Sequence, residues 1–293
     1  MFLSHIKQIL IGEEAAAQDL GPCLSYICRS NDLRIDTPLF IVKEKSALET
    51  MSGSGSESKS ISEILQAVES NEREHHNTRI ISASEVINKL NSQGSALVSL
   101  LEYVPAAESK GSGSAEMTAA LSGYAIIRGN KLCGYIDSEN ALGADFLLNK
   151  VGISDIVFAD SEGRPVSMEI SSGSCKLEGL WNDDSLQGIE VFIDVRAMVL
   201  EMQENPGISG NELSDFLISQ LESYVSSKTA YVLQLSRKLQ SDFLGLGPAL
   251  NIESPYKYSK LSQDFEDVLP QLQIKIYVSG ELCHTKDVKD GRI

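Results

Sequence analysis

The sequence predicts an α+β protein of three mixed α/β domains with largely antiparallel sheets. The first domain is incomplete, and the third is built on a long helix packed on a small sheet. Three observations lead to this prediction: helical and strand periodicities alternate along the chain, apolar residues alternate with other residues over 189–196, and an apolar stripe of helical spacing runs from Leu213 to Leu239. We expect domains at residues 1–51, 60–204 and 208–293.

Residues 1–51 contain too few elements for a core of their own. They read as a strand at 8–11, a helix beginning near Glu13, a strand at 39–42 and a short helix. Even a 60-residue domain buries only about 60% of its unfolded surface, so two strands and two helices do not suffice. We interpret this segment as the remainder of an N-terminal domain, separated from the middle region by the Gly/Ser stretch at 52–56.

The middle region, 60–204, mixes helical and strand periods. Two helical faces are expected, the second capped by Ser82 or Ser84. The turn Gly129-Asn130 predicts a hairpin because both residues tolerate positive φ. Asp137-Ser138 then caps a helix. The expected strands are 97–101, 118–128, 132–136, 153–158, 166–170 and 189–195, with a second Gly/Ser stretch, 111–114, on a loop.

The third region begins with Ser209 or Asn211 as a helix cap. The apolar stripe continues to about Ser241, which corresponds to a helix of roughly 45 Å at 1.5 Å per residue. Its packing partners are expected to be a final strand at 273–278 and a short helix through Leu261, Phe265 and Val268.

The composition excludes several classes of function. The 293 residues carry 25 Lys and Arg against 41 Asp and Glu, a net charge of −16, whereas nonspecific nucleic-acid binding needs clustered cations. No apolar run reaches the roughly 18–20 residues of a membrane-spanning helix, and the first residues do not form a signal peptide. We therefore expect a soluble chain that binds no nucleic acid, any export signal having been removed or lying upstream.

The cysteines and histidines predict neither a disulfide framework nor a metal site. The five cysteines contain no Cys-x-x-Cys pair and are interpreted as small buried hydrophobic residues. His75 and His76 are adjacent and so point in different directions. Cys283-His284 has no second pair to complete four ligands.

Other candidate motifs also have plain structural interpretations. Gly245 and Gly247 follow the end of the long helix, where left-handed residues terminate helices, whereas a phosphate-binding turn leads from a strand into a helix. No Gly-x-Ser-x-Gly elbow is present. The pairs Glu13-Glu14 and Asp183-Asp184 are expected by chance among 41 acidic residues. The sequence thus predicts no catalytic, cofactor or metal site.

Three blocks of residues, taken in order, resemble one known family. Residues 4–15 read Ser-His-Ile-Lys-Gln-Ile-Leu-Ile-Gly-Glu-Glu-Ala, and Arg29, Arg34 and the strand 39–42 come after them. Residues 123–137 read Gly-Tyr-Ala-Ile-Ile-Arg-Gly-Asn-Lys-Leu-Cys-Gly-Tyr-Ile-Asp, and residues 239–247 read Leu-Gln-Ser-Asp-Phe-Leu-Gly-Leu-Gly. This pattern resembles the Ger(x)C family, the lipoprotein C subunits of bacterial spore nutrient-germinant receptors.

The chain departs from the family pattern in a few places. Phe243 and Leu244 stand where hydrophobic residues of a slightly different order are usual, and Tyr256 and Phe265 take positions often held by Trp. The family's signal peptide, lipid-bearing Cys and opening strands have no counterpart before Met1, so we expect an N-terminally truncated member.

The resemblance implies a non-enzymatic subunit that acts in spore germination by docking or signal coupling. Its implied partners are integral-membrane A- and B-type receptor subunits, and a lipidated Cys upstream of this chain would hold it on the outer face of the spore inner membrane. A rival hypothesis is an extracytoplasmic small-molecule binding protein or enzyme with an interdomain site. A deep pocket lined by converging polar groups would favour this hypothesis. Direct binding to anionic lipid is disfavoured, since Lys/Arg clusters are lacking.

Residues that match the family motifs are the candidates for interaction with a partner. The polar candidates are Glu13, Arg29, Arg34 and Asp242, and the glycines Gly245 and Gly247 accompany them. The alternative role for the polar four is in helix caps and salt bridges inside a domain.

Overall fold

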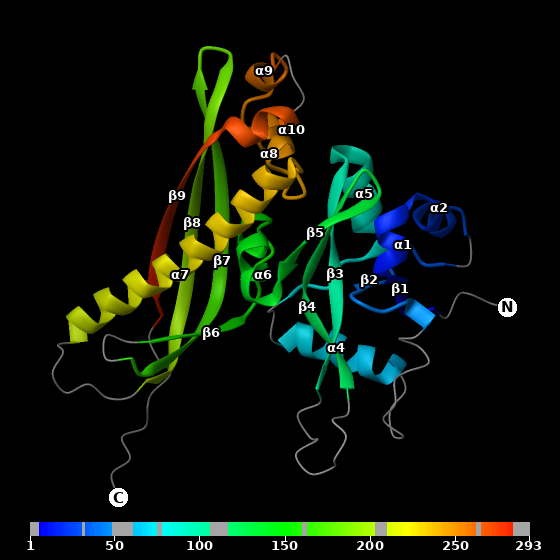
Figure 1. The fold of residues 1–293 in the computed structure, drawn as a ribbon. Coiled ribbons are helices and arrows are strands. Elements are labelled where there is room, and N and C mark those ends of the chain that lie inside the picture. Colours follow the sequence, from blue (N-terminus) through cyan, green and yellow to red (C-terminus); the bar gives the residue numbers. More distant parts are fainter. Residues whose placement is uncertain are drawn as a thin grey trace, which may run out of the picture. The chain divides into compact units, whose positions relative to one another are not determined.

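The chain forms two compact units. Figure 1 shows the computed structural model, which describes residues 6–30, 33–48, 61–74, 78–105, 117–159, 163–202, 210–261 and 265–283. Unit 1 comprises Met1–Ala141, Leu233–Pro248 and Gln263–Pro270. Unit 2 comprises Leu142–Val232, Ala249–Ser262 and Gln271–Ile293. Each unit contains one mixed sheet with helices, which confirms the predicted α+β class.

Unit 1 is built on a five-stranded sheet of order β1-β2-β3-β4-β5. The first three strands run parallel, and the β3-β4 and β4-β5 pairs are antiparallel. The strands are β1 (Ile9–Gly12), β2 (Leu39–Val42), β3 (Ser95–Pro105), β4 (Met117–Arg128) and β5 (Lys131–Asp137).

The segment expected to be part of a separate N-terminal domain belongs to this sheet. Strand β2 lies between β1 and β3, and all four of its side chains are buried, as its continuous apolar sequence allows. The two short strands gain a core because β2 pairs with β1 on one side and, on the other, with β3, which is more than 50 residues further along the chain. The expected boundary after residue 51 therefore does not coincide with a boundary between the compact units.

The predicted helix cap and hairpin turn of unit 1 are confirmed. The Oγ of Ser82 accepts the N–H of Glu85 (3.3 Å), and the left-handed Gly94 (φ 73°) ends the same helix, α5. Gly129 and Asn130 both have positive φ and form the β4-β5 turn. Helices that begin in this unit include α1 (Glu13–Gln18), α2 (Gly21–Arg29), α4 (Ile61–Glu74), α5 (Ala83–Gln93), α6 (Ser138–Leu147) and α10 (Phe265–Val268).

Unit 2 is built on a four-stranded sheet of order β6-β7-β8-β9. The β6-β7 and β7-β8 pairs are antiparallel, and β9 adds to β8 in parallel. The expected final strand is thus the edge of the same sheet as the strands of the middle region. The strands are β6 (Ser154–Ala159), β7 (Pro165–Asn182), β8 (Ser185–Met202) and β9 (Gln273–Leu282).

One face of the unit 2 sheet is covered by helices. The N–H of Gly280 on β9 donates to Glu222 of α7 (Gly210–Leu239), and a side chain at Gly280 would meet Ile218 of the same helix at 3.3 Å. A Cβ at Gly173 on β7 would lie only 2.4 Å from the Phe146 ring of α6, so only glycine fits there. The predicted long helix on a sheet is therefore confirmed, and Figure 1 shows α7 running along the strands.

The remaining helices lie after α7. They are α8 (Leu246–Glu253), α9 (Pro255–Tyr258) and the 3₁₀ turn η1 (Leu269–Gln271). Leu261 was expected to share a helix with Phe265 and Val268, but the helix that contains those two residues begins at Phe265.

Some expectations fall outside the described residues. These are the Gly/Ser stretches 52–56 and 111–114, the cap Ser209, and the histidines His75, His76 and His284. None of the described helices is both long and apolar enough to cross a membrane.

Candidate functional site

Asp242 lies in the turn between α7 and α8, with only 3% of its surface exposed. Its Oδ1 accepts the backbone N–H of Leu246 (2.7 Å), and its Oδ2 accepts that of Gly247 (2.8 Å). These are the first two N–H groups of α8, which have no acceptor inside the helix. The carboxylate therefore occupies the place at which a helix N-terminus would otherwise bind an anion.

A second carboxylate fixes the backbone of this turn. Glu266 Oε1 accepts the N–H of Asp242 (3.1 Å) and the hydroxyl of Ser95 (3.0 Å). Its Oε2 pairs with Arg128 Nη2 (3.1 Å), and Arg128 also donates to the carbonyl of Leu239 (3.2 Å). Strands β3 and β4 thereby hold the end of α7 and the start of α8.

The environment of Asp242 changes its acidity. Burial raises the pKa of the Asp242 carboxyl to about 7, and the charge of Glu266 acts in the same direction. The hydrogen bonds from Gly247, Leu246 and Gly245 oppose this rise because they favour the ionised form.

The two glycines of the motif serve the same turn in different ways. Gly245 has a left-handed backbone (φ 76°), and a Cβ there would meet Gln93 and Lys89 side-chain atoms at 3.1 Å. Gly247 provides the N–H that Asp242 binds. The expectation that these glycines end the long helix needs correction. The left-handed residue after α7 is Gln240 (φ 50°), and the glycines lead into α8.

Glu13 lies in a different cluster of unit 1, at the carboxyl ends of β1 and β2. The Tyr135 hydroxyl donates to its Oε1, and the N–H of Glu44 donates to its Oε2 (2.6 Å). These hydrogen bonds, chiefly the one from Tyr135, lower the pKa of Glu13. Burial raises the pKa of Tyr135, and its hydrogen bond to Glu13 adds to this rise.

The neighbours of Glu13 explain the Gly-Glu pair in its motif. A Cβ at Gly12 would meet the backbone of residues 45–47 at 3.1–3.2 Å, so only glycine lets this loop approach. Glu44 stands in the left-handed region (φ 58°), and its N–H is held by Glu13. The motif therefore fixes the loop that comes after β2.

Arg29 and Arg34 make only local, exposed contacts. Arg29 donates to the carbonyl of Ser25 one helical turn earlier (3.1 Å). Arg34 pairs with Asp36 (2.9 Å), and both side chains are more than 60% exposed. Within the described residues, the structure brings together Asp242, Gly245 and Gly247, and no hydrogen bond joins Glu13, Arg29 or Arg34 to that turn.

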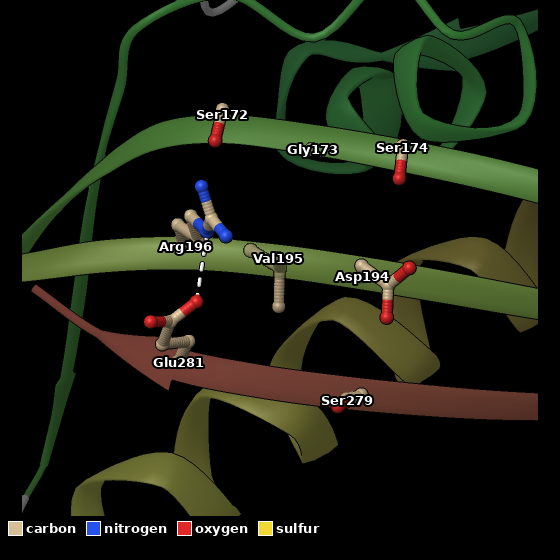
Figure 2. Close-up of a pocket in the computed structure, with 8 residues that line it drawn as sticks. All are labelled: Ser172, Gly173, Ser174, Asp194, Val195, Arg196, Ser279 and Glu281. Carbon is tan, nitrogen blue, oxygen red and sulfur yellow. Dashed lines mark hydrogen bonds and ion pairs between the residues drawn. The ribbon is translucent and has the colours of Figure 1, made fainter.

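An open pocket of about 410 Å³ lies on unit 2, on the face of its sheet away from α6 and α7. Figure 2 shows that its side chains come from three neighbouring strands. The residues that line it are Ser172, Gly173, Ser174, Asp194, Val195, Arg196, Ser279 and Glu281. Sequence reasoning missed this pocket. The alternation on β8 pointed Asp194 and Arg196 away from the core, but nothing in the sequence indicated that residues 172–174 and 279–281 flank them.

The described residues contain no cluster of three or more His, Cys, Asp or Glu side chains that could hold a metal ion. All five cysteines are free thiols, and four of them are exposed. The interpretation of the cysteines as buried is therefore wrong except for Cys175, which is partly buried and whose pKa is raised by burial to about 12. Asp183 and Asp184 form the β7-β8 turn, with Asp183 in a left-handed conformation (φ 51°).

Comparison with known proteins gives consistent results. The family described as "Spore germination protein N-terminal domain" matches residues 1–103, and "Spore germination B3/GerAC like, C-terminal" matches residues 122–286. Among solved structures, the one titled "Crystal Structure of the GerBC protein" is similar, with a TM-score of 0.70 and 16% sequence identity over 96% of this chain and 79% of that one. No curated protein sequence matches. The chain belongs to the Ger(x)C family of spore germination proteins, whose fold it shares with GerBC.

Proposed function

We propose that this chain is the C subunit of a spore nutrient-germinant receptor and that it acts by docking to other receptor subunits. The observation that carries this proposal is the consecutive match to both domains of the family along nearly the whole chain. Its partners are integral-membrane A- and B-type subunits, and it acts at the outer face of the spore inner membrane, held there by a lipidated cysteine.

The physical features of the described residues agree with docking rather than chemistry. The motif residues Glu13 and Asp242 are engaged in hydrogen bonds to backbone N–H groups, so their carboxylates hold loops. The pocket of unit 2 lies open on the outer face of a sheet, whereas small-molecule sites usually bury about 70–90% of their ligand. We therefore infer a non-enzymatic protein.

Gene deletion tests the proposal. Spores that lack this chain should fail to germinate with the nutrients of its receptor, and the gene supplied in full length should restore the response. The matched control is a trigger that bypasses nutrient receptors, to which the deletion spores should respond normally. Normal germination of deletion spores with every nutrient would contradict the assignment.

The small-molecule alternative has its own test. Calorimetric titration of the purified chain with each nutrient that germinates the spores should give no heat of binding. Saturable binding of one of these nutrients would favour the alternative.

A further inference from the structure

The open face of unit 2 is the surface formed by the outward side chains of β7, β8 and β9. Gly173 and Gly280 face the helices, so their neighbours Ser172, Ser174, Ser279 and Glu281 point to the other side. The paired residues of β8 on that side are Asp194 and Arg196, and Figure 2 shows these side chains together.

In the central rows of the open face, one carboxylate has no charged partner among the described residues. Three cations point outward in its central rows, and each has a carboxylate: Lys176 with Glu178 (2.6 Å), Arg196 with Glu281 (2.8 Å), and Lys275 with Glu190 (3.3 Å). Among the described residues, the side chain of Asp194 makes no ion pair and accepts no hydrogen bond. The pocket therefore carries an unbalanced negative charge at Asp194.

The neighbours of Asp194 keep it accessible. It pairs directly with Ser174 on one side and Ser279 on the other, and both side chains are short and exposed. Their hydroxyls have no hydrogen-bond partner among the described residues and can accept from the same donor. A carboxylate flanked by two hydroxyls suits an ammonium or guanidinium group with several N–H donors.

An aromatic surface adjoins this charge. Phe192 and Tyr277 lie two residues before Asp194 and Ser279 on β8 and β9 and pair directly across the strands. Their rings stack with centroids 5.1 Å apart. Tyr277 remains 46% exposed, although aromatic side chains are the residues that protein interfaces preferentially bury. The two rows are roughly 7 Å apart, which equals the separation of side chains i and i+2 in an extended chain.

We propose that the open face binds an extended polypeptide segment of a partner protein. The segment carries a Lys or Arg that reaches Asp194 and, two residues away, an apolar or aromatic side chain that covers the Phe192-Tyr277 stack. Charge complementarity selects this occupant: the pocket holds an unpaired carboxylate, and the chain as a whole carries a net charge of −16. The same charge disfavours a second copy of the chain and an anionic lipid surface.

The test rests on the proposed function, because its probes are the A- and B-type subunits. Detergent-solubilised A and B subunits are co-purified with tagged wild-type chain, Asp194→Lys, Tyr277→Ala and Glu201→Lys. Glu201 is the matched control, since it is an exposed acid on the same strand, roughly 23 Å further along. Wild type and Glu201→Lys should recover both subunits, and the other two variants should lose most of them.

A peptide array identifies the occupant. Overlapping peptides from the non-membrane parts of the A and B subunits should bind the wild-type chain where they contain a basic residue two positions from an apolar one. Asp194→Lys should weaken the best peptide at least about tenfold, and replacing that peptide's basic residue by Glu should restore binding to Asp194→Lys.

The outcomes separate this inference from the proposed function. If wild type recovers neither subunit, the proposed function fails. If wild type and Asp194→Lys recover the subunits equally, only the inference about the open face is overturned. Loss of binding in Asp194→Asn with unchanged thermal unfolding supports the inference. Self-association of wild type that Asp194→Lys removes would instead identify a second copy as the occupant and overturn it.

Discussion

At the scale of single residues, Asp242 illustrates how a buried acid can act as a helix cap. Its two oxygens satisfy the first two N–H groups of α8, so removal of the side chain leaves both without an acceptor. Asp242→Ala should reduce the free energy of unfolding by about 1–3 kcal/mol for each buried amide left unpaired, as measured by urea denaturation. The control is Ser241→Ala at the adjacent buried residue, whose hydroxyl has no partner, and which should leave stability unchanged.

The raised pKa of Asp242 predicts a specific dependence of stability on pH. The folded state binds the proton of this acid more tightly than the unfolded chain, whose value is near 3.8. Its contribution to stability is therefore fully present below pH 3.8 and is lost as pH rises toward about 7. In Asp242→Asn this loss should vanish, so the difference in unfolding free energy from wild type should change between pH 4 and 7. A constant difference across that window would show that Asp242 is ionised throughout.

The hydrogen bond between Glu13 and Tyr135 can be tested by mutation. Tyr135→Phe removes the donor that chiefly lowers the pKa of Glu13, so that pKa should rise toward its ordinary value, as NMR titration can follow. A double-mutant cycle of Tyr135→Phe and Glu13→Gln should give a coupling of about 1 kcal/mol, because the pair is only partly buried. Tyr26→Phe is the control, since this residue is exposed and its hydroxyl makes no hydrogen bond to the described residues. A coupling near zero would mean that the motif does not hold the loop after β2.

At the scale of elements, the packing of α6 on α7 depends on a glycine. A Cβ at Gly143 would lie 2.4 Å from the carbonyl oxygen of Lys228, which is backbone and cannot move aside. Gly143→Ala should therefore destabilise unit 2 by about 1–3 kcal/mol or more, measured by thermal or urea unfolding. Ser138→Ala, on an exposed position of the same helix, should have little effect. An unchanged or higher stability of Gly143→Ala would contradict the close helix contact.

The β7-β8 hairpin is the element whose extent was least evident from local signals. Residues 171–182 contain Ser, Gly and Asn, which are poor strand formers, and the sequence predicted a strand only over 166–170. Strand β7 nevertheless continues to Asn182 because β8, rich in alternating apolar residues, pairs with it along its length. A strong strand thus imposes structure on a weak one.

At the scale of the whole molecule, the chain assembles each unit from distant segments. Unit 1 takes its first strands from the start of the sequence and the turn around Asp242 from residues 233–248. Unit 2 takes its edge strand from residues after 271. The domain boundaries expected near residues 51 and 204 assumed that each domain is one continuous stretch of sequence. The compact units are instead defined by which strands pair.

The sequence alone determined those features of the fold that depend on local physical chemistry. The Ser82 cap, the Gly129-Asn130 turn and the long helix depend on residues within a few positions of one another, and so does the alternation on β8. Short-range hydrogen bonds and side-chain periodicity suffice to define such features. The family motifs likewise pointed to Glu13 and Asp242, though not to what these carboxylates contact.

Only the tertiary structure decided which segments meet. The pairing of β2 with β3, the burial of Asp242 against Glu266 and the row of Ser174, Asp194 and Ser279 all join residues that are far apart in the chain. Burial raises the pKa of Asp242, and strand register leaves Asp194 without a counter-charge among the residues that the structure describes. Both effects depend on desolvation and long-range pairing, which no local pattern encodes.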